Sequence, residues 1–472
     1  MSPLAQDART RSGKAEIAGK RVLVMGLGSF GGGAGATRFL VEQGARVTVT
    51  DQRPAGELRG SLEALAGAPV EYVLGEHRAA DFECAEIVVA NPAVPPHHPL
   101  LERARSSGAR ITSEIELFLE RVHARVVCVT GTQGKSSTCH LVASLLRGAG
   151  VPALLGGNFG GSLLSELGRI RPEEGVVLEL SSYQLEALED PLSLGERIDR
   201  VVAVAVVNVL ADHLERHGSV EAYAAAKRRI LDLVSPDGIA ILPREDPWAS
   251  RFEPARGRKL EFSVEPGAGT SLWIDEGRFL SGDEVLGRVA DLRLHGGFQR
   301  SNALVALGLA RALGAEPDRL AQALGEIRGL AHRLEPLGRR RGREVFDNGV
   351  STTPDSTISA LKALEPEVCL VLGGRAKKGL ALDGLAEAAR GRVALAVCFG
   401  EARELFSQAL AARGIRTEST ATLEEAVQVA FERSPAGCAV LFSPAGSSFD
   451  AFTNFRARAE AFRALLPPRD LP

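Results

Sequence analysis

The residues best suited to chemistry lie in one short segment, Gly131-Thr132-Gln133-Gly134-Lys135-Ser136-Ser137. It follows the apolar run 124–130, which predicts a buried strand, and precedes a helical pattern that continues to Arg147. A glycine turn between a strand and a helix directs backbone N–H groups at a phosphate, and the helix N-terminus adds positive potential. In such a turn Lys135 would reach the outer phosphates and Ser136 would bind Mg²⁺. The segment therefore predicts an ATP-type site rather than an ordinary glycine turn, although Val129 replaces the first glycine of the usual pattern.

Lysine is rare in this chain, with 8 lysines among 56 basic residues, so each lysine in a motif raises a functional question. An amine is a compact point charge and a potential nucleophile, whereas a guanidinium is neither. Lys227 stands directly before Arg228 and Arg229, where a third arginine would have supplied the same charge. The sequence leaves two interpretations of Lys227 open, a required amine or a charge on a solvated helix face.

Polar residues also follow two further strand candidates. Glu179 ends the apolar run 176–180, and Asp212-His213 comes shortly after the run 200–208. In an open α/β sheet, side chains at the carboxyl ends of strands point into the ligand crevice. A carboxylate there suits a hard cation such as Mg²⁺. His213 is either a metal ligand or a structural hydrogen-bonding residue.

A second glycine turn, Gly26-x-Gly28-x-x-Gly31, lies between the strand candidate 21–25 and a helical pattern, and the next strand candidate ends at Asp51. This order is typical of a Rossmann-like nucleotide-binding unit. It favours NAD when taken alone. Because the turn at 131–136 already predicts a nucleotide site, we expect a different nucleotide-like ligand here, and a turn without a ligand remains the alternative.

The elements that must position these residues alternate between strand and helix, which predicts an α/β fold with parallel sheets covered on both faces. The 472 residues predict about three domains, and we place them at 1–118, 119–326 and 327–472. The first and third would be Rossmann-like and the central one a P-loop-type ATPase domain. Polar stretches at 329–333, 347–354 and 443–450 in the third domain are either carboxylate-binding loops or plain loops.

Composition excludes several classes of protein. Hydrophobic residues make up 45% and charged residues 24% of the chain, which are ordinary globular values. The net charge of −3 argues against a dedicated nucleic-acid binder. The N-terminal twenty residues lack the apolar core of a signal peptide, and no apolar run is long enough to span a membrane. We expect a cytoplasmic monomer whose six scattered cysteines are reduced and mostly buried.

Taken together, these motifs resemble the Mur ligases, ATP-dependent amide-bond ligases of peptidoglycan precursor synthesis. The resemblance runs in order from about residue 20 to residue 466 and is most specific at three stretches, Glu179–Glu186, Asn208–Leu214 with Arg216 and Lys227, and Leu441–Phe455 with Arg458. Within the family it is strongest to the members that add glutamate to UDP-N-acetylmuramoyl-L-alanine through an acyl phosphate. It implies ATP, Mg²⁺ and those two substrates as ligands, and leaves open whether L- or D-glutamate is used.

The resemblance also implies roles for individual residues. Lys135, Glu179, His213 and Lys227 would be catalytic, with Ser136, Glu179, His213 and a carbamylated Lys227 as the Mg²⁺ ligands. The implied ATP-binding residues are Gly131, Thr132, Gly134, Lys135, Ser136, Ser137, Asn302, His332, Arg333 and Asp347. The implied substrate-binding residues are Gly28, Ser29, Phe30, Asp51, Asn158, Thr352, Lys377, Ser448 and Phe455.

The chain departs from the family pattern in three places. The family's H-N-x-x-N reads Phe298-Gln299-Arg300-Ser301-Asn302, and its N-D-S-K-A-T-N reads 347–353, with Val350 in place of lysine. Either Lys377 or Lys378 matches the lysine of the family's G-G-x-x-K. The alternatives are a different Mur or folylpolyglutamate-type ligase, an NAD-dependent oxidoreductase, or a nucleotide-binding regulator without catalysis.

Overall fold

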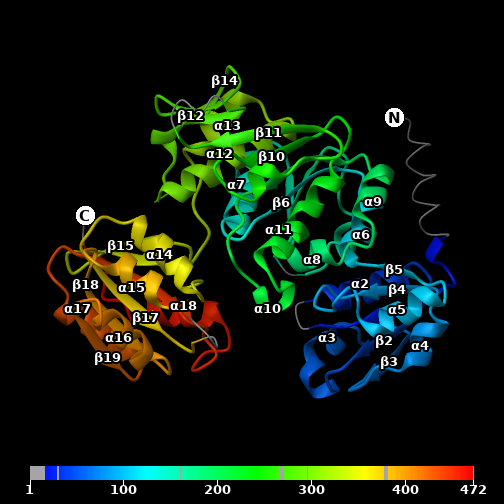
Figure 1. Cartoon of the computed structure of the whole chain (residues 1–472), viewed down its shortest axis with the longest axis horizontal. Coiled ribbons are helices and arrows are strands. Elements are labelled where there is room, and N and C mark those ends of the chain that lie inside the picture. Colours follow the sequence, from blue (N-terminus) through cyan, green and yellow to red (C-terminus); the bar gives the residue numbers. More distant parts are fainter. Residues whose placement is uncertain are drawn as a thin grey trace. The chain divides into compact units, whose positions relative to one another are not determined.

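The computed structural model describes residues 16–28, 31–159, 161–265, 270–294, 296–376 and 381–470. The chain divides into two compact units, and the shorter one, unit 2, consists of Leu292–Arg300 and the chain from Arg328 onwards. Unit 1 contains a five-stranded and a nine-stranded sheet, and unit 2 contains a six-stranded sheet (Figure 1). The α/β prediction is confirmed. Three domains with boundaries near residues 118 and 326 remain our proposal.

The five-stranded sheet is parallel throughout, in the order β3-β2-β1-β4-β5. Its strands are β1 (Arg21–Met25), β2 (Arg46–Asp51), β3 (Val70–Leu74), β4 (Ile87–Ala90) and β5 (Arg110–Thr112). The helices of this region are α2 (Gly32–Glu42), α3 (Arg59–Ala64), α4 (Ala79–Cys84), α5 (Pro99–Ser106) and α6 (Glu114–Leu119). The chain order reverses between β1 and β4, and a ligand crevice forms beside such a switch point.

Side chains that alternate along these strands build two separate cores. Val22 and Val24 pack with Phe39 of α2 on one face, whereas Leu23 and Met25 belong to a cluster on the other. Because successive strand residues point to opposite faces, a continuous apolar run such as Val22–Met25 is what a sheet covered on both faces requires.

The nine-stranded sheet has the order β14-β13-β12-β11-β10-β9-β6-β8-β7, and only β13 and β14 run antiparallel to their neighbours. Its first strands are β6 (Arg125–Thr130), β7 (Ala153–Gly157), β8 (Gly175–Glu179), β9 (Val201–Val206) and β10 (Ile239–Pro243). The remaining strands are β11 (Arg258–Ser263), β12 (Leu272–Asp275), β13 (Arg278–Ser281) and β14 (Glu284–Arg288). β6 lies between β8 and β9, so the turn after β6 is flanked by the ends of two other strands.

Helices accompany this sheet along the chain. They are α7 (Lys135–Gly148), α8 (Ser182–Glu186), α9 (Pro191–Arg197), α10 (Leu214–His217), α11 (Val220–Arg228), α12 (Gly297–Ala312) and α13 (Pro317–Leu324). The sequence predicts one helix over 220–233, but the α-helix ends at Arg228 and a 3-10 helix continues to Leu233. Among the residues described, every helix is too short or too polar to span a bilayer.

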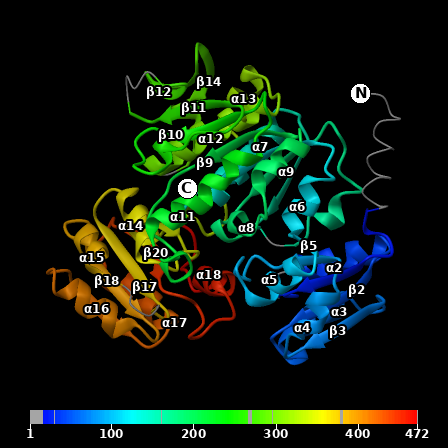
Figure 2. The same ribbon diagram turned by 45° about the vertical axis from the view of Figure 1, so that its right-hand side comes forward.

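The sheet of unit 2 has the order β15-β16-β20-β17-β18-β19 and is parallel except for the β15–β16 pair. Figure 2 labels its strands β17, β18 and β20. Its strands are β15 (Glu335–Arg340), β16 (Arg343–Asp347), β17 (Val368–Gly373), β18 (Val393–Phe399), β19 (Thr417–Thr420) and β20 (Ala439–Ala445). Its helices are α14 (Pro354–Lys362), α15 (Asp383–Ala389), α16 (Arg403–Ala411), α17 (Leu423–Arg433) and α18 (Phe455–Ala464). Leu370 packs toward α14–α16 and Val371 toward α17 and α18, which again gives two cores around one sheet.

The cysteines follow the expectation with one exception. Cys128, Cys139, Cys369, Cys398 and Cys438 are buried, whereas Cys84 at the end of α4 is exposed. Burial raises the pKa of Cys369 and of Cys398 to about 12, which keeps both thiols protonated at neutral pH.

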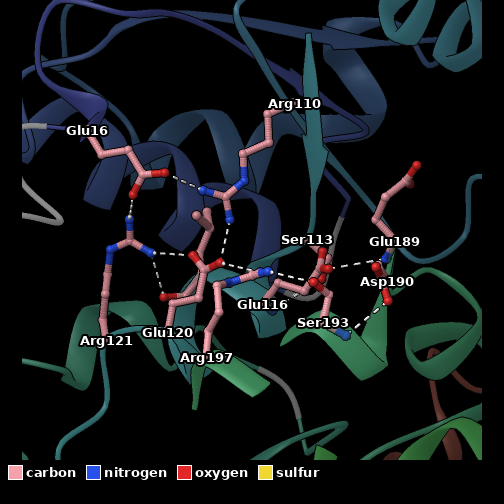
Figure 3. A network of polar contacts seen from close by, with 11 residues as sticks. Glu16, Arg110, Ser113, Glu116, Glu120, Arg121, Glu189, Asp190, Ser193 and Arg197 are labelled. Carbon is pink, nitrogen blue, oxygen red and sulfur yellow. Dashed lines mark hydrogen bonds and ion pairs between the residues drawn. The ribbon is translucent and has the colours of Figure 1, made fainter. Parts of the chain in front are cut away.

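A polar network ties α6 to the rest of unit 1 (Figure 3). Glu120 accepts hydrogen bonds from Arg110, at 2.6 Å, and from Arg197, at 3.3 Å. Glu116 accepts the backbone N–H of Glu189 at 3.1 Å, but its second carboxyl oxygen is buried and has no hydrogen-bond partner. Burial raises the pKa of Glu116 to about 7, and the neighbouring charge of Glu120 adds to that shift. The buried carboxyl is therefore protonated just below neutral pH.

We predict that Glu116→Gln stabilises the protein at pH 8 and leaves its stability almost unchanged at pH 5. The folded pKa of about 7 lies above the ordinary 4.5, so the unfolded state releases its proton first as the pH rises. Stability contributed by the protonated form is therefore lost between about pH 4.5 and pH 7. Glutamine imitates that form at every pH. Calorimetry should give a Tm gain of about 2–4 °C at pH 8.

The matched control is Glu120→Gln. Burial opposes ionisation of Glu120, but its hydrogen bonds and ion pairs with arginines lower its pKa below the ordinary value. This variant should lose stability at pH 8. An equal change in Tm for Glu116→Gln at both pH values would contradict the assignment.

Candidate functional site

The turn between β6 and α7 has the backbone that its glycines require. Gly134 has a φ of 81°, and a Cβ at this position would lie 2.5 Å from the Oδ1 atom of Asn302 in α12. Any side chain at 134 would therefore be strained and would collide with Asn302. Ser136 and Ser137 occupy the first turn of α7. The Lys135 ammonium donates to the carbonyl oxygens of Gly131, at 3.0 Å, and Thr132, at 2.8 Å.

Lys227 comes to the same turn from α11. Only 1% of this residue is exposed, and its ammonium donates to the carbonyl oxygen of Gly131 at 2.6 Å. The ammonium also lies 4.4 Å from the ring centroid of Tyr223. Burial and the nearby charge of Lys135 lower the pKa of Lys227 well below its ordinary value, against opposing contributions from Asp212 and Glu179. The interpretation of Lys227 as a solvated helix charge is therefore wrong, because this amine is buried.

Asn208, two residues after the end of β9, holds the turn from the other side. Its Oδ1 atom accepts the backbone N–H groups of Thr132, at 3.1 Å, and Gln133, at 2.9 Å. Its Nδ2 atom donates to the carbonyl oxygen of Gln133 at 3.1 Å. The amide side chain thus matches both a donor and an acceptor of the loop, which fixes the loop conformation before any ligand binds.

Glu179 stands at the end of β8, beside β6, and is 2% exposed. The Asn158 amide donates to its Oε1 atom at 3.0 Å, and the Asn158 backbone N–H donates to its carbonyl oxygen at 2.9 Å. Gly157 allows this approach, since a Cβ there would lie 2.2 Å from the same carbonyl oxygen. Asn158 and Glu179, which were predicted as separate site residues, are thus in direct contact.

His213 has a strained backbone and a half-exposed ring. Its φ is 51°, which is uncommon for a residue other than glycine. The ring lies 5.2 Å from the Tyr183 ring and 6.3 Å from the Tyr223 ring, measured between centroids. It also lies within ion-pair distance of Asp212 and Glu215. The ring is therefore on the α11 side of the turn, close to the residue that stacks on Lys227.

The five-stranded sheet carries a cavity of about 470 Å³ at the carboxyl ends of β1, β2 and β4. Gly28 and Asp51 line it, together with Met25, Gly26, Gln52, Arg53, His77, Asn91, Ala93, Val94, Pro95 and His98. The predicted Ser29 and Phe30 lie outside the described residues. The cavity occupies the switch-point crevice, where α/β sheets bind nucleotides.

The Asp51 carboxylate is already engaged within the protein. Its Oδ2 atom accepts the backbone N–H groups of Leu27 and Gly28, and Arg53 donates to both carboxylate oxygens. Burial opposes ionisation, but the hydrogen bonds from Arg53 and Gly28 lower the pKa of Asp51 below its ordinary value. Asp51 therefore remains ionised and holds the glycine turn.

Arg216 links this cavity to the central sheet. Its guanidinium donates to the Glu186 carboxylate at 2.9 Å and to the carbonyl oxygens of Ala93 and Val94, which line the cavity. It also lies over the Tyr183 ring, 5.0 Å from the centroid. One side chain thus connects α8 with the wall of the cavity.

In unit 2, His332 and Asp347 form a buried pair. The His332 Nδ1 atom and the Asp347 Oδ2 atom are 2.7 Å apart, and Arg463 donates to the same oxygen at 2.7 Å. Arg463 also pairs with Glu335. His332, Glu335 and Asp347 are close enough to hold a metal ion, but the Arg463 guanidinium already forms ion pairs with both carboxylates. We therefore place no metal ion in this cluster. Arg333 is half-buried beside it.

The residues of unit 2 that are predicted to bind the amino-acid substrate lie in separate segments. Thr352 is half-buried before α14, Ser448 is buried after β20, and Phe455 begins α18. Lys377, like Lys378, lies outside the described residues.

Several of the residues that shape these sites were not predicted from the sequence. Arg53, His77, Asn91 and His98 line the first cavity, and none of them belongs to a recognisable motif. Asn91 carries a usable signal, because it directly follows β4, the strand beyond the switch point.

Comparisons with known proteins bear on the identity of the chain. Residues 20–113 match the model described as Mur ligase MurD-like, N-terminal domain, and residues 129–310 match the Mur ligase middle domain. Residues 332–446 match the Mur ligase, glutamate ligase domain. The UDP-N-acetylmuramoylalanine--D-glutamate ligase of Roseiflexus sp. strain RS-1 is 36% identical, over 96% of this chain and 99% of that protein. The chain belongs to the Mur ligase family.

Other similar proteins agree with that assignment. The ligase of the same description from Trichlorobacter lovleyi is 35% identical over 95% of this chain and 98% of its own length. MurF from Acinetobacter baumannii shares the fold, with a TM-score of 0.59 at 17% identity, over 94% of this chain and 92% of that chain. This Mur ligase is an ATP-dependent enzyme that forms amide bonds, so the oxidoreductase and regulator alternatives are excluded.

We predict that Lys135→Ala abolishes turnover in a protein that remains folded. The substitution removes the ammonium that would face the transferred phosphate, and loss of such a group lowers kcat by about 100-fold or more. ADP formation and the Tm should be measured together. Lys362→Ala, which removes an exposed lysine at the end of α14, is the matched control and should retain full activity. Normal ADP formation by folded Lys135→Ala would exclude the phosphate-loop assignment.

Proposed function

We propose that this ligase joins D-glutamate to the alanyl carboxylate of UDP-N-acetylmuramoyl-L-alanine, a step of peptidoglycan precursor synthesis in the cytoplasm. The relatives that are 36% and 35% identical over nearly the whole chain carry that activity in their names. Their names also supply the stereochemistry of glutamate, which the sequence alone leaves open.

The observation that carries the proposal is the buried amine of Lys227 against the phosphate-type turn. A lysine whose pKa is lowered is unprotonated more often, and only the unprotonated amine reacts with CO₂. The reaction forms an N–C bond, releases one proton and leaves an anionic carbamate. This converts a buried cation beside Gly131 into an oxygen donor.

The residues around the turn suit Mg²⁺. Ser136 offers a hydroxyl at the start of α7, and Glu179 offers a buried carboxylate at the end of the neighbouring strand. A carbamate on Lys227 would add a second anionic oxygen ligand, and His213 a ring nitrogen. Oxygen-rich sets of this kind fit a hard divalent cation. Bound Mg²⁺ would neutralise charge on the phosphate oxygens during transfer.

The protein's own groups would then act in two stages. The turn N–H groups and Lys135 hold the ATP phosphates while an alanyl carboxylate oxygen attacks the γ-phosphorus, which yields ADP and an acyl phosphate. The glutamate amine next attacks the acyl carbon, phosphate leaves, and the amine releases a proton. Asn158 would orient Glu179, with which it shares two hydrogen bonds. Asn302, His332, Arg333 and Asp347 would serve the nucleotide.

The cavity in the five-stranded sheet would receive the UDP part of the acceptor. Its backbone turn and the side chains of Arg53, Asn91 and two histidines suit a uridine diphosphate. The Asp51 carboxylate is occupied by backbone N–H groups and Arg53, so it is unavailable to an NAD ribose. Thr352, Ser448, Phe455 and a lysine at 377 or 378 would receive glutamate.

The deciding assay measures ADP release with ATP, Mg²⁺, UDP-N-acetylmuramoyl-L-alanine and a single amino acid. Release should require all four components and D-glutamate in particular. Equal rates with L-lysine or meso-diaminopimelate would instead indicate another specificity within the family.

We predict that the first cavity binds the uridine nucleotide and not NAD. Titration calorimetry with UDP-N-acetylmuramoyl-L-alanine should give a saturable heat, and NAD should give none. Asp51→Ala should weaken the UDP-substrate about 10-fold, because the turn loses a charge-assisted contact of about 1.5 kcal/mol. Tight binding of NAD without binding of the UDP-substrate would refute the assignment.

We also predict that Lys227→Arg is folded and almost inactive. Arginine keeps a positive charge but forms no carbamate and offers no anionic oxygen. Lys227→Ala should be inactive alone and should regain activity when a small carboxylic acid, such as formate or acetate, is added. The adjacent exchange Arg228→Lys is the control and should remain active. If Lys227→Arg turns over like the parent enzyme, the carbamate hypothesis is wrong.

A further inference from the structure

A fully buried arginine connects three loops of unit 2. Arg458 lies in α18, one turn after Phe455, and is 0% exposed. Its Nη1 atom donates to the carbonyl oxygen of Gly446 at 2.9 Å. Its Nη2 atom faces the carbonyl oxygens of Gly349, at 3.4 Å, and Ser351, at 3.3 Å. One guanidinium thus holds the loop before Thr352 and the loop before Ser448.

The third loop, after β17, packs against the same guanidinium. A Cβ on Gly374 would lie 2.7 Å from the Arg458 Nη1 atom and 2.3 Å from the carbonyl oxygen of Ser447. Arg375 and Ser447 exchange backbone hydrogen bonds of 2.9 and 2.8 Å. The loop that leads toward Lys377 is therefore paired with the loop that leads to Ser448, and Arg458 lies directly beneath the pair.

The charge of Arg458 has no partner of opposite sign at contact distance. Among residues 296–376 and 381–470, no carboxylate forms an ion pair with it, and its Nε atom has no hydrogen-bond partner. Burial lowers the pKa of Arg458 to about 10, partly offset by Asp450, so the side chain stays charged at neutral pH. A buried cation that has no carboxylate at contact distance is costly to folding. We therefore looked for a role of the Arg458 charge other than folding.

We propose that Arg458 is a positioning residue for the amino-acid substrate, whose guanidinium fixes the spacing of the three loops and whose unpaired charge favours a dicarboxylate bound above them. This inference rests on the proposed function, because the loops carry the residues proposed to receive glutamate. Glutamate brings two carboxylates, whose negative charge would balance the positive charge of Arg458. Lysine would keep the charge, but a single ammonium does not reproduce the planar fork that reaches both loops.

The test compares Arg458→Lys and Arg458→Met with the wild-type enzyme. Arg390→Lys makes the matched exchange at a side chain that is 69% exposed, at the end of α15. Steady-state ADP release gives kcat and a separate KM for D-glutamate, ATP and UDP-N-acetylmuramoyl-L-alanine. We expect the glutamate KM to rise at least 10-fold in Arg458→Lys and further in Arg458→Met. The other two KM values should stay within about 2-fold, and Arg390→Lys should match the wild type.

A purely structural role would lower the active fraction, and hence kcat, without changing the glutamate KM selectively. An unchanged glutamate KM, or an equal rise in all three KM values, overturns the proposal. Backbone hydrogen exchange provides a second readout that needs no turnover. Without substrates, the segments 349–352, 373–376 and 446–448 should exchange faster in Arg458→Met than in Arg390→Lys. Unchanged exchange there also overturns the proposal.

The wild-type assay separates the two hypotheses. If wild-type ADP release does not depend on glutamate, the proposed function fails, and the exchange measurement still decides whether Arg458 orders the loops. If release depends on glutamate but the Arg458 variants keep its KM, only the positioning role fails.

Discussion

One carbonyl oxygen, that of Gly131, accepts hydrogen bonds from two lysines, and the central site depends on this shared contact. Lys135 belongs to the turn itself, whereas Lys227 reaches it from α11. Two ammonium groups at one acceptor repel each other, and burial adds to the cost of the second charge. Burial and the charge of Lys135 together lower the pKa of Lys227 well below its ordinary value, so the proton on Lys227 is disfavoured. The turn is thus both the proposed phosphate site and the segment that holds the Lys227 amine.

The order of the strands explains how a few residues can form the central candidate site. β6 lies between β8 and β9, so Glu179 and Asn208 meet the turn from both sides without any long loop. The five-stranded sheet uses the same rule, since its cavity lies at the carboxyl ends of β1, β2 and β4. In both sheets the topology brings the polar residues together at the carboxyl ends of neighbouring strands. Arg216 then connects the two sites through backbone carbonyls that line the first cavity.

The sequence predicted those features of the structure that depend on local composition and on hydrophobic periodicity. Apolar runs predicted β1, β6, β8 and β9, and the scarcity of lysine singled out Lys227 before its burial was known. β7 and β19 escaped prediction because the first ends in two glycines and the second, Thr-Glu-Ser-Thr, is a polar edge strand. Saturation of Asp51 by backbone N–H groups and the convergence of loops on Arg458 were also unpredictable. Both arise from contacts between distant segments, about which hydrophobic periodicity carries no information.

The distribution of cysteines has a practical consequence for spectroscopy. Five thiols are buried, and Cys84 alone among the six is exposed, at the end of α4. A maleimide dye applied to the native protein should therefore attach at a single point, beside the sheet that carries the first cavity, without any engineered cysteine. The natural chain thus provides its own attachment point for a fluorescent reporter. Denaturation would expose the remaining five thiols, so the number of thiols that react would report unfolding.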